Sequence, residues 1–408
     1  MNSTVLFEMA LGLGSPWIIQ DVKFENDKEI KELHITIGFE KKYKFTDEEN
    51  IDCSVYDTKK RVWQHLNFFE HKCYLHCKVP RIKNSIGKVT MVDVPWSRSG
   101  SGFTLLFEAF AMRLIESEMP MNKVAKLLKV HANSIWTIFN YWVKTSYAED
   151  NIENVTQLGI DETSSKKGHK YITVAVDLEA RRVIHATEGK NAKTIDKIKD
   201  HLLSKSVEPA QIQHASIDLS PSFISGLKNN FPDAEIHFDR FHVKKLLNEA
   251  MDDVRKLERK EHAELKGHKY TFLKTKNKLS AKKNLELSEL ITLFPTLGNA
   301  YRLKELFDDV WQMDSEAEAS AFIDDWVKEV EKSNIPAFIK FSRTVVKHKS
   351  GIINFVTNKI NNGILESINS KIQLAKKRAR GYRNIDNFIN MVYFLCGKLN
   401  LNFPHDYA

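Results

Sequence analysis

The sequence predicts a multidomain α/β protein, in which a β-rich module and a helical region precede a mixed sheet flanked by helices. Its 408 residues exceed one ordinary domain, since a domain averages roughly 150 residues. Hydrophobic residues make up 42% of the chain, which is enough apolar material for several cores. The hydrophobic period changes along the chain from that of strands to that of helices, and then back. With 16 glycines and 10 prolines, the composition excludes fibrous and low-complexity classes.

The first region, residues 1–98, alternates apolar and polar residues over short stretches, as strands do. These stretches are HITIGF, KYKF, CYLHCKVPRI and KVTMVDVPW. The turn-rich segment Ser97–Gly102 marks the boundary with the next region. We therefore expect a small β-rich module here.

The second region, residues 99–150, has helical periodicity. The pattern predicts helices over Phe103–Ser117, Asn122–Leu128 and Ser134–Lys144, with Ser134 at the N-cap of the last one. This is the outline of a helix-turn-helix, although an ordinary helical hairpin gives the same pattern. In a helix-turn-helix, Asn133 and Ser134 would open the helix that contacts DNA.

The third region combines strands and helices. Strands are expected in QLGIDETS, in KYITVAVDLEARRVIHATEG on both sides of a turn, in HASIDLS and in AEIHFDRFHV. Helices are expected over Lys193–Leu203, Pro221–Asn230, nearly all of residues 243–350, about Asn362–Arg378 and Asn384–Leu399. A three-stranded meander followed by αβ units indicates a mixed sheet flanked by helices.

The overall composition points to a cytoplasmic protein with a polyanionic partner. The formal net charge is +8, which suits such a partner. Four cysteines are too few for a disulfide framework, so we expect a reducing compartment. The first residues have no basic segment and carry Glu8 within their apolar stretch, so no export signal is expected. The apolar run Phe103–Ile115 contains Glu108 and Arg113, and we expect no membrane span.

Three carboxylates stand where an active site could form. Asp161 and Asp218 each end an apolar strand pattern, and Glu366 lies on a predicted helix. The carboxyl ends of strands line the ligand crevice in open α/β sheets. Such a set could hold two Mg²⁺ ions for phosphoryl transfer. The alternative is that the aspartates are turn residues and that the glutamate is solvated.

Asp239 and His242 form a second candidate pair. Asp239 would end the next strand, and His242 would lie one helical turn further on. The pair could orient the carboxylates or contact the substrate. The alternative is a hydrogen bond between this Asp and this His at a strand-to-helix turn.

A basic run near the C-terminus is a candidate phosphate-binding surface. Glu366 would share a helix face with Asn369, Ser370, Gln373 and Lys377. The alternative is a solvated basic face. The cations of the run, among which no acid stands, are Lys371, Lys376, Lys377, Arg378, Arg380 and Arg383.

The cysteines of the β-rich module do not predict a zinc site. Cys53, Cys73 and Cys77 lie there with several histidines, but no CxxC pair is present. We therefore expect no bound zinc.

Taken together, these segments resemble the ISL3 family of bacterial insertion-sequence transposases, over nearly the full length. The segments that carry the resemblance are VYDTKKRVWQHLNFFEHKCYLHCKVPRI, VPWSRSGSGFTLLFE, GIDETSSKKGHKYITVAVDLEARRVIHATEG, SIDLSPSFISG, FDRFHVKKLLNEA and NGILESINSKIQLAKKRARGYRN.

The resemblance implies an RNase H-like fold with an Asp-Asp-Glu triad at Asp161, Asp218 and Glu366. It makes Asp239 and His242 neighbours of the active site. It also implies a domain order, namely a degenerate zinc-ribbon-like DNA-binding module (1–98), a helix-turn-helix (99–150), a catalytic domain (155–242 and 351–402) and a helical insertion (243–350).

The chain departs from the family in its N-terminal module. The family carries two CxxC-like pairs there, whereas this chain keeps Cys53 alone and has Asn84 and Gly87 at the second pair. The resemblance therefore implies a module that has lost its zinc.

The implied activity is Mg²⁺-dependent cleavage and transfer of DNA strands, with Mn²⁺ as a substitute ion. The implied partners are double-stranded DNA at the element's ends and at the target, and a second copy of the chain. Two alternatives stay open at this point, a domesticated DNA-binding protein without catalysis and an RNase H-like nuclease of RNA.

Overall fold

The computed structural model describes residues 3–27, 31–166, 168, 170–358, 360 and 363–402. The chain forms two compact units, Met1–Glu149 with Asn400–Ala408, and Asp150–Leu399.

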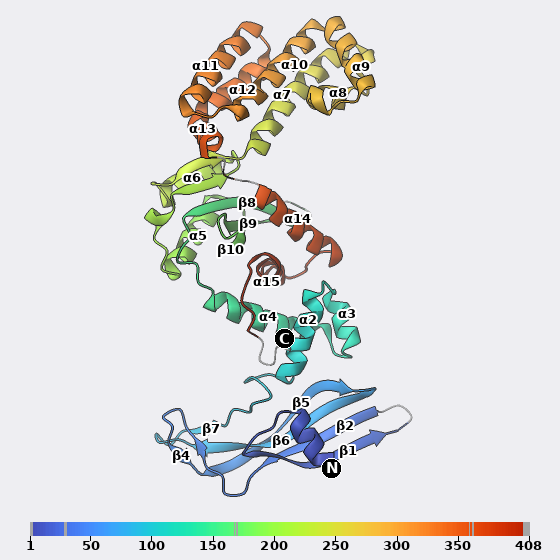
Figure 1. The fold of residues 1–408 in the computed structure, drawn as a ribbon, viewed down its shortest axis with the longest axis vertical. Coiled ribbons are helices and arrows are strands. Elements are labelled where there is room, and N and C mark those ends of the chain that lie inside the picture. Colours follow the sequence, from blue (N-terminus) through green and yellow to red (C-terminus); the bar gives the residue numbers. More distant parts are fainter. Residues whose placement is uncertain are drawn as a thin grey trace. The chain divides into compact units, whose positions relative to one another are not determined.

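The first unit begins with a β module (Figure 1). Its main sheet has the order β1-β2-β6-β5, with β7 added beside β6, and its β2–β6 pair is parallel. Leu33, Ile35 and Leu75 are almost fully buried in its core, because every second residue of β2 and β6 faces inward. The expected β-rich module is confirmed. Its elements are α1 (Ser3–Ala10), β1 (Trp17–Asn26), β2 (Lys31–Phe39), β3 (Phe45–Thr46), β4 (Asp52–Cys53), β5 (Val55–Phe68), β6 (His71–Lys83) and β7 (Val89–Met91).

Three helices follow, α2 (Leu105–Glu116), α3 (Met121–Leu127) and α4 (Ala132–Glu149). They confirm the expected helices, but the placement of Ser134 at an N-cap was wrong. Helix α4 begins at Ala132, so Ser134 lies in its first turn and donates its N–H to the carbonyl of His131. The turn is shorter than expected because Lys129 adopts a left-handed φ of 56°, which reverses the chain in few residues.

Glu108 is the buried polar centre of these helices. Its carboxylate is 0% exposed and accepts hydrogen bonds from Arg98 Nε (2.9 Å), Ser101 Oγ (2.6 Å) and Trp142 Nε1 (2.8 Å). The Arg98 guanidinium also stacks 3.7 Å above the ring of Tyr141. A charge that interrupts the apolar run of α2 therefore ties α2 to α4 and to the preceding linker.

The second unit is built on a mixed sheet with the order β10-β9-β8-β11-β12. Strands β8, β9 and β10 form an antiparallel meander, whereas β8, β11 and β12 run parallel. The expected mixed sheet is confirmed. Its strands are β8 (Gln157–Lys166), β9 (Lys170–Asp177), β10 (Arg182–Glu188), β11 (His214–Ile217) and β12 (Glu235–Phe238).

Helices cover this sheet and continue beyond its β12 edge (Figure 1). At the β10 edge, the Tyr393 hydroxyl of α15 pairs with both the N–H and the carbonyl of Ala186. At the β12 edge, Asn354 of α13 donates to the carbonyl of Ile236. Both edges therefore have polar cover from helices. The helices are α5 (Ala192–Ser204), α6 (Pro221–Asn230), α7 (Arg240–Glu261), α8 (Lys269–Leu273), α9 (Ala281–Leu293), α10 (Pro295–Phe307), α11 (Glu316–Ser333), α12 (Pro336–Lys347), α13 (Lys349–Asn358), α14 (Gly363–Arg378) and α15 (Ile385–Cys396).

The stretch from α7 to α12 confirms the expected helical character of residues 243–350. Short 3₁₀ turns join some of its helices, and its core includes Trp326, Phe307 and Phe338. The expected start of the penultimate helix, Asn362, lies outside the described residues, and α14 is described from Gly363.

Candidate active site

The parallel strands place three aspartates at one level of the sheet. Ser216 pairs with Gly159, and Ile217 pairs with Phe238. Asp161 lies two residues after Gly159, and Asp218 lies two residues after its partner Ser216. Asp218 directly follows Ile217, and Asp239 directly follows its partner Phe238. The same register therefore brings Asp161, Asp218 and Asp239 into one row, and the two-residue period of strands puts them on one face.

Asp161 was expected at the end of its strand, and the structure corrects this. Strand β8 continues to Lys166 because it forms a hairpin with β9. The parallel pairing with β11, however, stops at Gly159. Asp161 therefore lies just beyond the carboxyl end of the parallel part of the sheet, where α/β folds form their crevice.

Helix α14 packs along β8 and brings further polar side chains to this row (Figure 1). A Cβ on Gly159 would lie 2.9 Å from Leu365 Cδ2, so the missing side chain lets the helix approach. Asn369 Nδ2 donates to Asp161 Oδ2 (2.6 Å), and Gln373 Nε2 donates to Thr163 Oγ1 (2.6 Å). Asn369 and Gln373 are four residues apart, which is about 6 Å along a helix. Their partners on β8 are two residues apart, which is about 6.6 Å along a strand, so both hydrogen bonds can form together.

The environment of Asp161 disfavours its ionised form. Burial raises the pKa of Asp161 to about 6, and the nearby Asp218 and Asp239 also raise it. The backbone N–H of Glu162, 2.7 Å from Oδ1, and the side chain of His242 partly offset this rise. A cation at this row would relieve the same electrostatic cost.

Asp239 and His242 lie together at the start of α7. Asp239 caps the helix by accepting from the N–H of Phe241 (2.9 Å), and its Oδ2 is 3.8 Å from Nε2 of His242. The Asp–His hydrogen bond expected as an alternative is therefore not formed, and Asp239 bonds instead to the backbone of Phe241. At the same time, both side chains interact electrostatically with Asp161, so His242 lies beside the row to which Asp239 belongs.

Glu366 is exposed on the first turn of α14, one helical turn before Asn369. It lines a cavity of about 1300 Å³, which Asp239, Arg240, Phe241 and Lys244 also line. In the described part of the chain, Asp161, Asp218 and Glu366 do not form a group with ligand atoms within 4.8 Å of one another. The structure thus aligns the aspartates in one row and places Glu366 in the lining of the adjoining cavity.

Two residues near the row were missed by the sequence reasoning. Glu162 follows Asp161 directly, and its carboxylate lies 3.8 Å from Lys190 Nζ. Burial raises the pKa of Glu162, whereas Lys190 lowers it. The acidic pair in GIDET was a signal for Glu162, but nothing local in the sequence points to Lys190.

The basic run divides into two groups. Lys376 Nζ donates to the carbonyl of Ser164 (2.6 Å), so this lysine holds α14 against β8. Helix α14 ends at Arg378, where Arg380 and Gly381 adopt positive φ angles of 55° and 91°. The exposed cations are Lys371, Lys377, Arg378, Arg380 and Arg383.

In the first unit, Asn133 is exposed on the first turn of α4, and Ser134 is half-buried beside it. Trp136 is also half-buried, with its ring 5.6 Å from that of Phe139. Asn133 is therefore the more accessible of the two candidate DNA contacts.

Comparison with known proteins agrees with this arrangement. Residues 92–143 match the helix-turn-helix domain of transposase family ISL3. Residues 158–392, more than half of the chain, match the transposase domain model of the same family. The chain belongs to transposase family ISL3.

Relatives of this transposase match it along most of its length. It is 26% identical over 418 aligned positions to the transposase for insertion sequence element IS1557 of Mycobacterium tuberculosis, covering 94% of this chain and 93% of the relative. It is 25% identical to the transposase for insertion sequence element IS1001 of Bordetella parapertussis, covering 82% of this chain and 84% of the relative. Among the described residues of the transposase, no helix combines the length and apolar character needed to cross a bilayer.

Asp161→Asn is expected to stabilise the transposase when divalent ions are absent. The folded-state pKa of Asp161, about 6, lies above its unfolded value near 4, so ionisation costs stability as the pH rises between them. At pH 8 in EDTA, the neutral side chain should raise the free energy of unfolding by about 3 kcal/mol. The gain should shrink from about pH 6 toward pH 4, where Asp161 is protonated in the folded state as well.

Thermal unfolding of both proteins at pH 5 and pH 8 measures this difference. Asp233→Asn, an exposed carboxylate, serves as the control and should change little at either pH. If the wild type is more stable than Asp161→Asn at pH 8, ionisation of Asp161 does not destabilise the folded protein.

Proposed function

We propose that this protein cleaves DNA at the ends of its insertion sequence and joins those ends to target DNA. The row of Asp161, Asp218 and Asp239, with Glu366 presented by α14, carries this proposal. In this proposal the catalytic domain is RNase H-like, and the order of three antiparallel and two further parallel strands supports it.

The donor set fits Mg²⁺, with Mn²⁺ as a substitute. Asp161, Asp218 and Glu366 offer hard carboxylate oxygens, and burial raises the pKa of Asp161, which a bound cation would lower. These three residues would hold the ions, which supply Lewis acidity for phosphoryl transfer. The ligand atoms of the triad must still converge when the ions bind, which requires a movement of these side chains.

The side chains around the row have supporting tasks. Asn369 and the backbone N–H of Glu162 each donate a hydrogen bond to one oxygen of Asp161 and so fix the orientation of its carboxylate. His242 adds a group that can bear a positive charge near Asp161 and Glu162. Arg240, Lys244 and Lys245 line the adjoining cavity and would neutralise phosphates of a bound strand.

The DNA-binding parts have separate tasks in this proposal. The helix-turn-helix would recognise the element's ends through Asn133 and the first turn of α4, together with the β module. The exposed cations after Glu366 would contact phosphates without reading sequence. Because two ends must be joined, the active form would be a dimer or larger assembly on DNA.

The test uses purified protein, Mg²⁺ and short duplexes that carry the element's ends. Cleavage at the end and joining to a second duplex support the proposal. Binding to the ends without any cleavage would favour a regulator, and cleavage of RNA–DNA hybrids alone would favour an RNA nuclease. A duplex with scrambled ends is the substrate control.

The exposed cations should set affinity rather than sequence preference. Changing Lys377 and Arg380 together to Ala should weaken binding to all duplexes alike, and the slope of log affinity against log salt should become shallower by about 1.8. Asn133→Ala, in contrast, should weaken binding to the ends more than to random DNA. Fluorescence anisotropy at several salt concentrations measures both effects.

The matched control removes two lysines elsewhere. Lys328 and Lys332 lie on α11 and pair with neighbouring acids, so their double change to Ala should leave the salt slope unaltered. If the Lys377/Arg380 variant lost its preference for the ends at an unchanged slope, the run would read sequence instead.

A further inference from the structure

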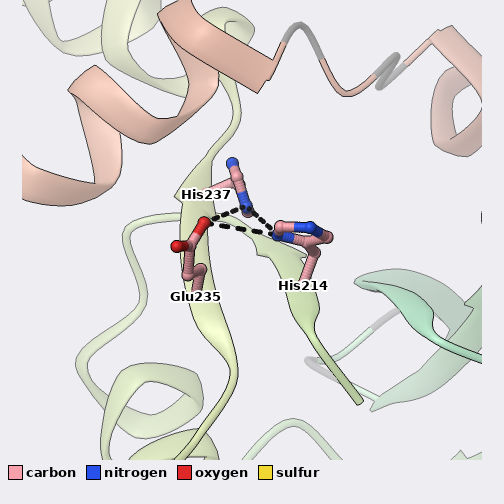
Figure 2. A group of neighbouring side chains, drawn as sticks. All are labelled: His214, Glu235 and His237. Atoms are coloured by element: carbon pink, nitrogen blue, oxygen red, sulfur yellow. Dashed lines mark hydrogen bonds and ion pairs between the residues drawn. The ribbon is translucent and has the colours of Figure 1, made fainter. Parts of the chain in front are cut away.

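A cluster of two histidines and a glutamate lies at the amino ends of β11 and β12 (Figure 2). His214 opens β11, Glu235 opens β12, and the two residues are direct partners in the parallel ladder. His237 lies two residues further along β12, on the same face as Glu235. The cluster therefore occupies one small patch of the sheet.

The three ligand atoms have the spacing of a metal site. Nδ1 of His214 lies 3.1 Å from Nε2 of His237 and 3.4 Å from Oε2 of Glu235, and these last two atoms are 4.0 Å apart. The point equidistant from all three lies about 2.1 Å from each, which matches zinc–nitrogen and zinc–oxygen bond lengths of about 2.0–2.2 Å.

Hydrogen bonds do not join all three atoms at once. Nδ1 of His214 carries at most one proton, which can serve either His237 or Glu235 but not both. At 4.0 Å, Glu235 is too far to accept a hydrogen bond from His237. His237 is 0% exposed, so its Nε2 has no access to water and depends on His214 Nδ1 for a hydrogen bond within the cluster. One cation would pair with all three atoms at once.

We infer that His214, Glu235 and His237 bind one Zn²⁺ ion. Two imidazoles and one carboxylate are a ligand set that zinc accepts, with water in the fourth position. Glu235 is 55% exposed, which leaves one side of the cluster open for that water. Asn358 of α13 donates to Oε2 of Glu235 (3.3 Å) and would help to orient this ligand.

The ion would clamp the two strands that carry Asp218 and Asp239. Each of these aspartates lies four residues, or roughly 13 Å, beyond the strand's first residue, so the zinc would be distinct from the catalytic row. Its role would be to hold the short strands β11 and β12 in register. The earlier expectation of no zinc came from the cysteines of residues 1–98, and this inference replaces it for the chain as a whole.

Elemental analysis of the full-length protein tests the inference. After exposure to Zn²⁺ and dialysis against metal-free buffer, the wild type should retain about one zinc per chain. Glu235→Gln and His237→Gln should each lose most of it. Because Glu235 is largely exposed, its variant should fold even if the His237 variant does not.

Two variants control for other sites. His34→Gln alters the other group of this kind among the described residues, in which Glu25 already pairs with Lys23. Asp161→Asn alters the catalytic row. Both should retain zinc as the wild type does.

The inference is overturned if the wild type holds no zinc, or if Glu235→Gln and His214→Gln both keep it. It is also overturned if Cys73→Ser loses the ion. Replacement of zinc by Co²⁺ gives an independent readout on the wild type, since thiolate ligands produce an intense near-ultraviolet charge-transfer band. A spectrum without that band supports nitrogen and oxygen ligands, and a spectrum with it assigns the metal to cysteines.

Discussion

Asp161→Asn, Asp218→Asn and Glu366→Gln are each expected to lower strand cleavage and transfer by a factor on the order of a thousand or more. Each change removes one carboxylate from the proposed metal site. That site would stabilise the charge that develops in the transition state by several kcal/mol. Binding to the element's ends should stay close to wild type, because no part of α4 is altered. Cleavage of labelled duplexes under single-turnover conditions, with anisotropy for binding, measures the two effects separately.

Glu331→Gln provides the control for loss of a carboxylate. Glu331 is exposed on α11, so its variant should cleave as the wild type does. Any of the three site variants that retained wild-type strand transfer would remove its residue from the triad. The outcome for Glu366 is the most informative, since the structure places it in the lining of the adjoining cavity.

The second large effect is expected in the helix-turn-helix. Glu108→Ala should destabilise the first unit by about 3–5 kcal/mol, because it leaves the Arg98 guanidinium and the Trp142 indole N–H without their buried partner. Binding to the ends should fall with the folded fraction. Thermal unfolding followed by tryptophan fluorescence, together with anisotropy, reports both.

Glu116→Ala is the matched control. Glu116 also pairs with an arginine, Arg113, but both side chains are about half exposed, so the loss should be below about 1 kcal/mol. Glu108→Gln should recover part of the stability, since its carbonyl oxygen can still accept from Trp142. Equal stability of Glu108→Ala and Glu116→Ala would contradict the role of the buried network.

Local features of the site were predictable from the sequence. The helical period of residues 103–144 located α2, α3 and α4, and Pro221 marked the start of α6. Asp239 and His242 were expected at a strand-to-helix turn, where the structure places them. Each of these features depends on neighbours within about one helical turn, which the sequence displays directly.

Other features could not be predicted, because they depend on pairing between distant segments. Helix α14 approaches Asp161 through the missing side chain of Gly159, and Lys376 is bonded to Ser164 although it stands in a run of surface cations. The residues around Lys376 in the sequence do not predict either contact. The same holds for the continuation of β8 past Asp161, which follows from its hairpin with β9.

The sequence by itself therefore determined the order of strands and helices, the identity of the acidic residues and the position of the helix-turn-helix. Tertiary structure alone decided the register that aligns Asp161 with Asp218 and Asp239, and the meeting of His214 with Glu235 and His237. The physical reason is that periodicity reflects local burial, whereas a strand's register is decided by its partner. A shift of one residue would turn each of these side chains to the opposite face.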